Sequence, residues 1–504
     1  PSKAAYDRRD AVENREKLRM VDKSEPVMAL SPAEVQELVT EQFLRNGIRQ
    51  VGVQLFGDAE RAAAPERLTP QAVALVREEY SGDMNDEKVR RVMRFATFVE
   101  LAPGATNVPA GRLAELADAL RNVVERGGIV MAQGEEAARL ATEYTDPKTG
   151  DVAPGLNVLP GVSVRIAADD RSLEGNAHKH APTLLGLTLP KTGAIAIAGR
   201  QFEVLEGKVE LSLAASHMRE AATQTLKAGD QLDFIELTRA AAERGRKAFP
   251  VAQPSEPRVE NGSLVIVGGG GMPRGLLSRF VTLSGGPDAL IVYIPCEEAD
   301  EVPRDQGMLD ALRRAGAKNV TWLHTKDRGR ANDDEEFLAP LRSAGGIWFG
   351  GGRQWNLVDS YQNTTAHKLM QEVLERGGCI GGSSAGASIQ SEYMPRGSPR
   401  VNTIVDAEGY EQGLAFLRGA AVDQHFTQRR RGPDLNRLIE QYPQYLGIGI
   451  DETTAIVVHG SRAEVVGDFT VNFFDARNGE LQRTSLSAGA VYDLVERREV
   501  VEKE

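Results

Sequence analysis

Short apolar runs alternate with helix-compatible segments along the second half of the chain, and this alternation restricts the fold more than any other feature. The apolar runs predict strands at residues 264–267, 290–294, 320–323, 347–349, 379–382, 446–450 and 455–458. Strands that alternate with helices build a mostly parallel sheet with helices on both faces. The sequence therefore predicts a doubly wound α/β domain, in which sites form at the carboxyl ends of the strands.

An internal repeat extends this prediction to the first half of the chain. The segment VVERGGIV at residues 123–130 recurs 250 positions later as VLERGGCI at residues 373–380. Weaker matches keep the same order, and they pair residues 97–99 with 347–349, 155–161 with 413–419, 185–189 with 446–450 and 193–197 with 454–458. Ordered matches at nearly constant spacing predict two tandem doubly wound domains, each with a mostly parallel sheet.

Composition divides the chain into four parts. Residues 1–25 are charged and poor in apolar side chains, which predicts a loose N-terminal arm. Residues 251–262 combine prolines with polar side chains and are expected to be an interdomain linker. The first copy of the fold is then expected at residues 26–250 and the second at residues 263–504.

The overall composition argues against several classes of function. A net charge of −12 disfavours nucleic acid as the main partner, and no apolar run approaches the roughly 20 residues that cross a bilayer. Cys296 and Cys379 are too few for a disulfide framework, and His178 and His180 lack a third nearby metal ligand. We expect a soluble protein without metal or cofactor. It is cytoplasmic or, since Pro1 is compatible with a processed N-terminus, exported after removal of a signal peptide.

A cluster of small residues at 377–388 (GGCIGGSSAGAS) marks a sharp turn between a predicted strand and a helix-compatible segment. Gly382, Ser384 and Gly386 occupy the positions of a G-x-S-x-G nucleophile elbow, in which the serine projects above the sheet. Small residues also occur where a helix packs closely against a sheet. The motif alone therefore leaves a purely structural interpretation equally open.

A serine nucleophile needs a base and a third group that orients the base. Among the histidines of the second half, His425 has the best position, because it ends an apolar run and precedes the basic cluster 429–431. His459 at the end of another strand is an alternative. Asp451 and Glu452 follow a predicted buried strand, and either is a candidate for the third group. A capped, solvated turn is the competing interpretation of these two acids.

Three motifs together resemble the cyanophycinase and peptidase E family of serine peptidases: G-x-S-A-G-A at 382–387, D-Q-H-F at 423–426 and G-I-G-I-D-E at 447–452. The resemblance extends from the glycine-rich segment 267–271 to about residue 458, nearly the whole second half. It implies a three-layer α/β sandwich of the flavodoxin-like or class I amidotransferase-like kind. That implied fold agrees with the alternation of strands and helices.

The resemblance also implies catalytic roles. Ser384 would be the nucleophile, His425 the general base and Glu452 the residue that orients it. The oxyanion hole would use the backbone N–H of Ala385 and one from the loop that contains Gly351 and Gly352.

Members of this family act on aspartyl peptides: cyanophycinases release β-aspartyl-arginine from an arginine-decorated polyaspartate, and peptidase E relatives cleave after an N-terminal aspartate. The resemblance implies that the substrate would be bound by Asp423, Gln424, Arg429, Arg431 and Arg437. Arg437 is displaced by an apparent insertion, in which Pro433 is expected to break a helix. The D-Q-H-F motif favours the cyanophycinase branch, with hydrolysis of a cyanophycin-like polymer to β-Asp-Arg through an acyl-enzyme. An α-aspartyl dipeptidase and an inactive binding or scaffold protein are the alternatives.

The first copy lacks each chemical group that the second carries. Gly134 takes the place of Ser384, Ala167 that of His425 and Lys191 that of Glu452, while residues 100–102 replace the glycine loop. We therefore expect the first half to be inactive and to stand in for a second subunit, as an intrachain pseudo-dimer. A further homodimer of the whole chain stays open.

Overall fold

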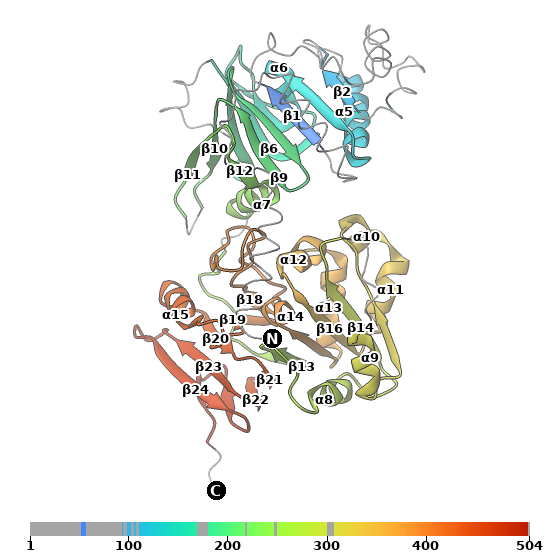
Figure 1. Ribbon diagram of the computed structural model, residues 1–504, viewed down its shortest axis with the longest axis vertical. Helices are drawn as coiled ribbons and strands as arrows, with labels where there is room; N and C mark the ends of the chain where they lie inside the picture. Colours follow the sequence, from blue (N-terminus) through green and yellow to red (C-terminus); the bar gives the residue numbers. More distant parts are fainter. Residues whose placement is uncertain are drawn as a thin grey trace, which may run out of the picture. The chain divides into compact units, whose positions relative to one another are not determined.

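The computed structural model describes residues 52–56, 93, 98–101, 105–106, 110–168, 180–216, 219–245, 249–299 and 307–501. The chain divides into two compact units, Pro1–Ala248 and Phe249–Glu504 (Figure 1). The predicted N-terminal arm and His178 lie outside the described residues. The predicted linker at 251–262 is too long at its C-terminal end. Strand β13 (Val259–Val267) already begins there, since Val259 pairs with Gly460.

The larger sheet of the second unit has the strand order β15-β14-β16-β17-β13-β21-β22-β25-β26. Its strands are β15 (Asn319–Trp322), β14 (Leu290–Cys296), β16 (Gly346–Gly352), β17 (Cys379–Ser383), β13, β21 (Thr454–Gly460), β22 (Arg462–Gly467), β25 (Val491–Asp493) and β26 (Arg498–Glu499). The five strands from β15 to β13 pair in parallel, whereas β21 is antiparallel to β13 and begins an antiparallel extension. The prediction of a parallel sheet is therefore confirmed for the strands from β15 to β13 and not for the strands from β21 to β26.

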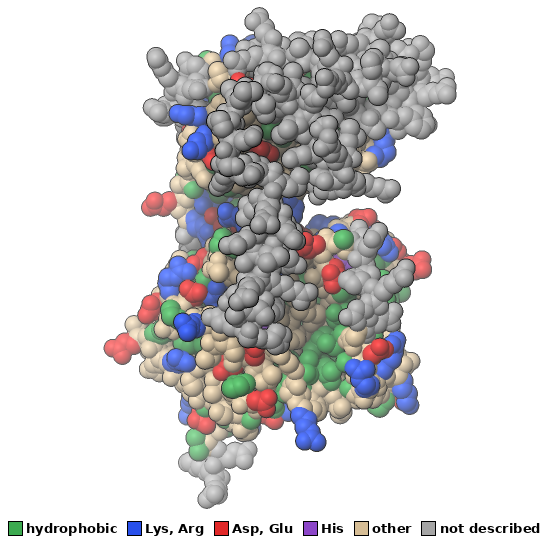
Figure 2. Space-filling view, viewed as in Figure 1, with side chains coloured by type: hydrophobic (Ala, Val, Ile, Leu, Met, Phe, Trp, Pro, Cys, Tyr) green, Lys and Arg blue, Asp and Glu red, His purple; other side chains and the backbone are tan. Residues whose placement is uncertain are grey.

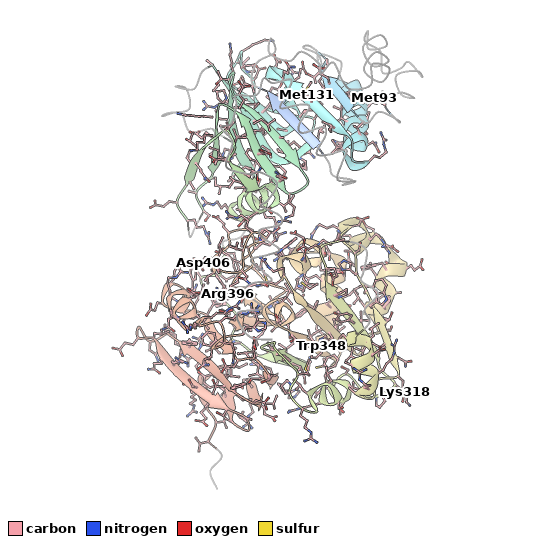
Figure 3. The ribbon with its side chains drawn as sticks, in the orientation of Figure 1. Met93, Met131, Lys318, Trp348, Arg396 and Asp406 are labelled. Carbon is pink, nitrogen blue, oxygen red and sulfur yellow. The ribbon has the colours of Figure 1, made fainter. Side chains whose placement is uncertain are left out.

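Helices cover both faces of the parallel strands (Figure 1). They are α8 (Leu276–Leu283), α9 (Gly307–Arg314), α10 (Arg328–Asp333), α11 (Glu335–Ser343), α12 (Trp355–Tyr361) and α13 (Thr365–Glu375). Successive strand residues point to opposite faces, so Val265 of β13 packs in a cluster with α8 while its neighbour Ile266 joins the cluster of α11 and α13. Trp348 is fully buried on the α8 side, edge-on to Phe280 (Figure 3).

A second, five-stranded sheet was not predicted. Its order is β18-β19-β20-β23-β24, with β18 (Ser391–Tyr393), β19 (Leu417–Gln424), β20 (Leu446–Ile450), β23 (Thr470–Asp475) and β24 (Gln482–Ser487). The apolar run 446–450 therefore lies in a different sheet from its neighbour 455–458, which corrects the prediction of one sheet. Helix α15 (Gly432–Gln441) packs on β20 and β23.

The ends of four strands meet where the two sheets approach each other. In the larger sheet Val267 pairs with Ser383, and in the second sheet Gln424 pairs with Ile450. The N–H of His425, which follows β19, donates to the carbonyl of Gly268, which follows β13, at 2.8 Å. The residues after these strands are thereby gathered in one place, as expected for the carboxyl edge of an α/β sheet.

The described part of the first unit also forms two sheets, with orders β12-β9-β8-β1-β3-β2 and β11-β10-β7-β6-β4-β5. The strands are β1 (Gly52–Phe56), β2 (Phe98–Leu101), β3 (Ile129–Gln133), β4 (Ala141–Thr145), β5 (Val152–Pro154), β6 (Leu159–Ala167), β7 (Leu185–Pro190), β8 (Ala194–Ala198), β9 (Gln201–Glu206), β10 (Lys208–Leu213), β11 (Ala222–Lys227) and β12 (Gln231–Asp233). The helices described in this unit are α5 (Ala110–Glu125), α6 (Gly134–Arg139) and α7 (Phe234–Arg244).

The strand orders of the two units correspond. The series β2-β3-β1-β8-β9-β12 corresponds strand by strand to β16-β17-β13-β21-β22-β25. The strands follow the same order along the chain, and neighbours pair in the same directions. The series β4-β6-β7-β10-β11 likewise corresponds to β18-β19-β20-β23-β24. Two copies of one fold would have this relation.

The described surface carries charges of both signs, and acidic and basic side chains are interspersed on the face seen in Figure 2. Among the described residues, no helix has both the length and the apolar character to span a membrane.

Candidate active site

Ser384 lies on the turn between β17 and the short helix α14 (Ala385–Ser388), with φ 57° and ψ −112°. A non-glycine residue rarely adopts this conformation, and such strain concentrates at functional sites. The packing around the turn requires glycine on both sides. A Cβ on Gly382 would lie 2.2 Å from the carbonyl oxygen of Gly386, and a Cβ on Gly386 would lie 2.3 Å from that of Phe349.

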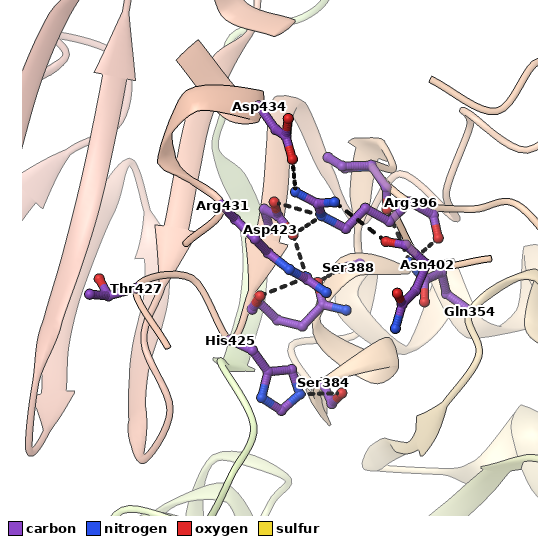
Figure 4. A network of polar contacts seen from close by, with 12 residues as sticks. Gln354, Ser384, Ser388, Arg396, Asn402, Asp423, His425, Thr427, Arg431 and Asp434 are labelled. Carbon is purple, nitrogen blue, oxygen red and sulfur yellow. Dashed lines mark hydrogen bonds and ion pairs between the residues drawn. The ribbon is translucent and has the colours of Figure 1, made fainter. Parts of the chain in front are cut away.

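The three side chains predicted to act together are in contact. Ser384 Oγ lies 2.8 Å from His425 Nε2 (Figure 4). On the other side of the ring, His425 Nδ1 lies 2.7 Å from Glu452 Oε1. A carboxylate at Nδ1 fixes the proton on that nitrogen and leaves Nε2 to accept the serine proton. The arrangement can therefore activate a serine nucleophile.

The alternative candidates, His459 for the base and Asp451 for the orienting residue, make different contacts. The buried Asp451 accepts hydrogen bonds from the N–H of Thr427 at 2.9 Å and from the hydroxyl of Thr470 at 2.8 Å. It therefore holds the turn after His425 and the start of β23. His459 Nδ1 lies 2.8 Å from the carbonyl oxygen of Gly262, at the other end of the sheet.

A run of four glycines, Gly268 to Gly271, forms the floor under the histidine and the glutamate. A Cβ on Gly269 would lie 2.3 Å from His425 Cε1, and a Cβ on Gly270 would lie 2.5 Å from Glu452 Oε2. Both glycines also have positive φ, at 95° and 69°. Four glycines directly after a buried strand already signal in the sequence that other atoms approach this backbone closely.

His425 is buried, and its environment lowers the pKa of its imidazole to about 4. Burial is the largest cause and the positive charge of Arg429 the next, and together they outweigh the carboxylate of Glu452. The imidazole is therefore neutral near pH 7, which is the form that can accept a proton.

The glycine loop at the end of β16 lies beside the serine. A Cβ placed on Gly351 would be 3.6 Å from the Cβ of Ser384, and both Gly351 and Gly352 are exposed. Gly352 has φ 146°, and a Cβ there would approach the carbonyl oxygen of Cys296 to 2.8 Å. Ala385 follows the serine directly and is fully buried. Of the predicted oxyanion residues, Ala385 and Gly351 thus lie next to Ser384, whereas Gly352 lies beside Cys296.

Two of the predicted substrate-binding residues are paired with each other. Arg431 and Asp423 are both buried, and Arg431 Nη1 lies 2.7 Å from Asp423 Oδ1 and 2.7 Å from the carbonyl oxygen of Gln424. Arg396, which the sequence analysis missed, contacts Asp423 from the other side at 3.1 Å (Figure 4). The hydroxyl of Ser388 donates to Gln424 Oε1, which fixes the orientation of that amide.

The surroundings of Pro433 and Arg437 differ from those predicted from the sequence. Pro433 does not break a helix, because it lies in the first turn of α15, where its missing N–H would have no helical partner. Arg437 is 58% exposed along its side chain and pairs with Asp406 at 3.3 Å. Arg429 is half-buried, and its charge acts on His425.

Among the described residues, no group of three or more His, Cys, Asp or Glu side chains could hold a metal ion. Cys296 and Cys379 are both free and buried. In the first unit, His180 contacts Ser212 Oγ at 3.2 Å. A cavity of about 410 Å³ lies between the segment Val251–Ser255, α13 and the loop before β19, away from the serine.

Comparison with known proteins places the second unit in a family. The family model described as Peptidase family S51 matches residues 259–466. A cyanophycinase from Synechococcus elongatus is 35% identical over 213 residues, which are 41% of this chain and 64% of that relative. A cyanophycinase from Geminocystis herdmanii is 30% identical over 209 residues, which are 40% of this chain and 75% of that relative.

A third relative is named a probable alpha-aspartyl dipeptidase, from Drosophila melanogaster. It is 28% identical over 200 residues, which are 38% of this chain and 77% of that relative. The resemblance to the cyanophycinase and peptidase E family is confirmed by these matches, and the chain belongs to peptidase family S51.

Proposed function

We propose that the second unit is a serine peptidase in which Ser384 is the nucleophile, His425 the general base and Glu452 the residue that orients it. The observation that carries this proposal is the continuous series of contacts of 2.8 Å and 2.7 Å through the three side chains. The strained backbone of Ser384 and the neutral state of His425 support the same assignment.

In the proposed reaction Ser384 Oγ forms a bond to the scissile carbonyl carbon while its proton moves to His425 Nε2. The carbonyl oxygen becomes negative and is stabilised by the N–H groups of Ala385 and Gly351, each worth about 3 kcal/mol in comparable sites. His425 then gives the proton to the leaving amine, and the C–N bond breaks to leave an acyl-enzyme. A water molecule, deprotonated by His425, hydrolyses the ester and restores Ser384. Glu452 stabilises the imidazolium that forms in each half-reaction.

The proposed substrate is a peptide with an aspartyl residue at the scissile bond. This proposal draws on the names of the cyanophycinase relatives and on the cation of Arg429 next to the base. The Gln424 amide, held through its oxygen by Ser388, has N–H groups that can donate to a substrate carboxylate. Asp423 and Arg431 shape the wall of the site through their mutual ion pair, and Arg437 lies with Asp406 instead.

Cleavage of a cyanophycin-like polymer to β-Asp-Arg is the favoured version of this function. An α-aspartyl dipeptidase activity is the second candidate, and the Drosophila relative favours it. A binding or scaffold protein of the same fold is the non-enzymatic alternative.

For the first unit we propose a tandem copy of the same fold that has lost the chemistry. The corresponding strand orders support a duplication, and the pairs Gly134/Ser384, Ala167/His425 and Lys191/Glu452 support the loss. We propose that it serves as the inactive partner in an intrachain pseudo-dimer.

An activity panel tests these assignments. Wild type and Ser384→Ala would be compared on cyanophycin, β-Asp-Arg, isoaspartyl peptides and α-aspartyl peptides, and both would be treated with a fluorophosphonate probe. We expect wild type to be labelled at Ser384 and to hydrolyse one substrate class, and the variant to do neither. Turnover retained by Ser384→Ala would contradict the mechanism, and a wild type that neither labels nor hydrolyses would favour the binding protein.

A further inference from the structure

Arg396 is a buried arginine that belongs to none of the motifs of the proposed catalytic machinery. It lies three residues after β18 and is 4% exposed. Its guanidinium is shared between two carboxylates: Nε lies 3.1 Å from Asp423 Oδ2, and Nη2 lies 2.7 Å from Asp434 Oδ2 (Figure 4). A planar fork that meets two carboxylates in fixed directions restricts the positions of all three groups.

The backbone of Arg396 makes a second connection. Its carbonyl oxygen accepts a hydrogen bond of 2.8 Å from Gln354 Nε2, and its N–H donates to the carbonyl of Val405 at 3.0 Å. Gln354 follows Gly352 of the glycine loop by two positions and also donates to the carbonyl of Pro395 at 3.0 Å. Arg396 has φ 62°, a strained conformation for a non-glycine residue. Asp406, the residue after Val405, belongs to the same loop as Arg396, and both residues are labelled in Figure 3.

Arg396 therefore joins the two sides of the proposed active site. Its backbone holds the segment that carries Gly351 and Gly352, and its side chain holds Asp423, two residues before His425. Asp423 also receives Arg431, whose Nη1 reaches the carbonyl oxygen of Gln424 directly before the histidine.

We propose that Arg396 is a positioning residue for the reaction assigned to Ser384: it fixes the glycine loop and the His425 segment at the separation that transition-state stabilisation requires. This inference rests on the proposed function. Arg396 touches neither the serine nor the histidine and acts through Gln354 and Asp423. A misplacement of about 1 Å at a catalytic group can lower a rate about 100-fold.

The test uses the full chain and measures three quantities for each variant: the rate of fluorophosphonate labelling at Ser384, kcat and KM on the best substrate of the panel, and Tm. For Arg396→Gln we expect labelling and kcat to fall about 10- to 100-fold at a temperature where the protein is folded, with a smaller change in KM. Arg396→Lys keeps the charge but loses the fork, so it should recover part of the rate. Arg418→Gln, which removes an exposed arginine at the start of β19, is the matched control and should keep the wild-type rate.

A second variant decides the matter if Arg396→Gln does not fold. Asp434→Asn removes one arm of the fork at a carboxylate that is 44% exposed and leaves the pair with Asp423 intact. It should fold and should label more slowly than wild type. Labelling of folded Arg396→Gln or of Asp434→Asn at the wild-type rate would overturn the inference, as would an equal fall in Arg418→Gln. A wild type that does not label would instead overturn the proposed function.

Discussion

The two units contain the same turn with different chemistry. Gly134 directly follows β3, which pairs with β1, and Ser384 directly follows β17, which pairs with β13. Both residues have positive φ, at 53° and 57°. A Cβ on Gly134 would meet nothing within 4 Å, so a serine would fit there apart from its backbone strain. The turn therefore belongs to the fold, while the serine belongs to the proposed reaction.

The larger difference lies in the partners of the turn. In the second unit the strand ends carry His425 and Glu452 above a floor of glycines, whereas the first unit ends β6 with Ala167 and follows β7 with Lys191. A strained serine without a neutral base beside it gains nothing in reactivity. The proposed site therefore depends on groups that follow strands of both sheets of the second unit. Three variants and one change of conditions test this difference between the units.

The largest effect is expected for Glu452→Gln. The amide keeps the shape of the side chain but no longer stabilises the imidazolium, and it can favour the wrong tautomer of His425. We expect kcat to fall about 10³- to 10⁴-fold with little change in Tm, measured on the substrate identified by the panel. Asp451→Asn is the informative counterpart, because Asp451 holds backbone and hydroxyl groups instead; it should lower Tm more than it lowers kcat. The reverse pattern would assign the orienting role to Asp451.

Gly269→Ala tests the glycine floor. The added methyl would lie 2.3 Å from the imidazole at a φ of 95°, so the imidazole or the backbone of residue 269 must shift and the contact of His425 with Ser384 is disturbed. We expect kcat to fall about 100-fold, together with a loss of stability. The control is Gly275→Ala, which also has a positive φ, 74°, but has no atom within 4 Å of the added methyl. It should lose about 1 kcal/mol of stability and keep its activity. Equal losses of activity in both variants would show that backbone strain alone is responsible.

Much of this arrangement could be predicted from local patterns. The apolar runs marked most of the strands, and position after a strand suggested Ser384 and His425. Only the family resemblance separated Glu452 from its neighbour Asp451. The division into two sheets could not be predicted, since only residues 451–453 separate β20 from β21, and so short a connection is typical of neighbours in one sheet. Arg396 was missed for a related reason. An arginine between proline and glycine is typical of a solvated loop, and its burial depends on Asp423, 27 positions away.

The pH dependence should reveal the low pKa of His425. Because the neutral imidazole is required, kcat/KM should stay level as the pH falls from 7 and then drop about tenfold per pH unit below about 4. Stability should change in a different range. The unfolded chain binds a proton near pH 6.5 and the folded chain only near 4, so the free energy of unfolding should decrease as the pH falls between these values. His425→Gln should lack this part of the slope, and an activity that already falls near pH 6.5 would contradict the role of burial.

The smallest effect is expected where the two units are made more alike. Gly134→Ser, introduced in the Ser384→Ala background, places a hydroxyl on the corresponding turn of the first unit. We expect no labelling by fluorophosphonate and no turnover, because Ala167 offers no base and Lys191 no carboxylate. A matched variant, Gly134→Ala, should show the same Tm as Gly134→Ser, since both add a Cβ to open space at the same positive φ. Labelling at residue 134 would mean that the first unit supplies a base from elsewhere, and the contrast between a chemical and a purely structural turn would then be lost.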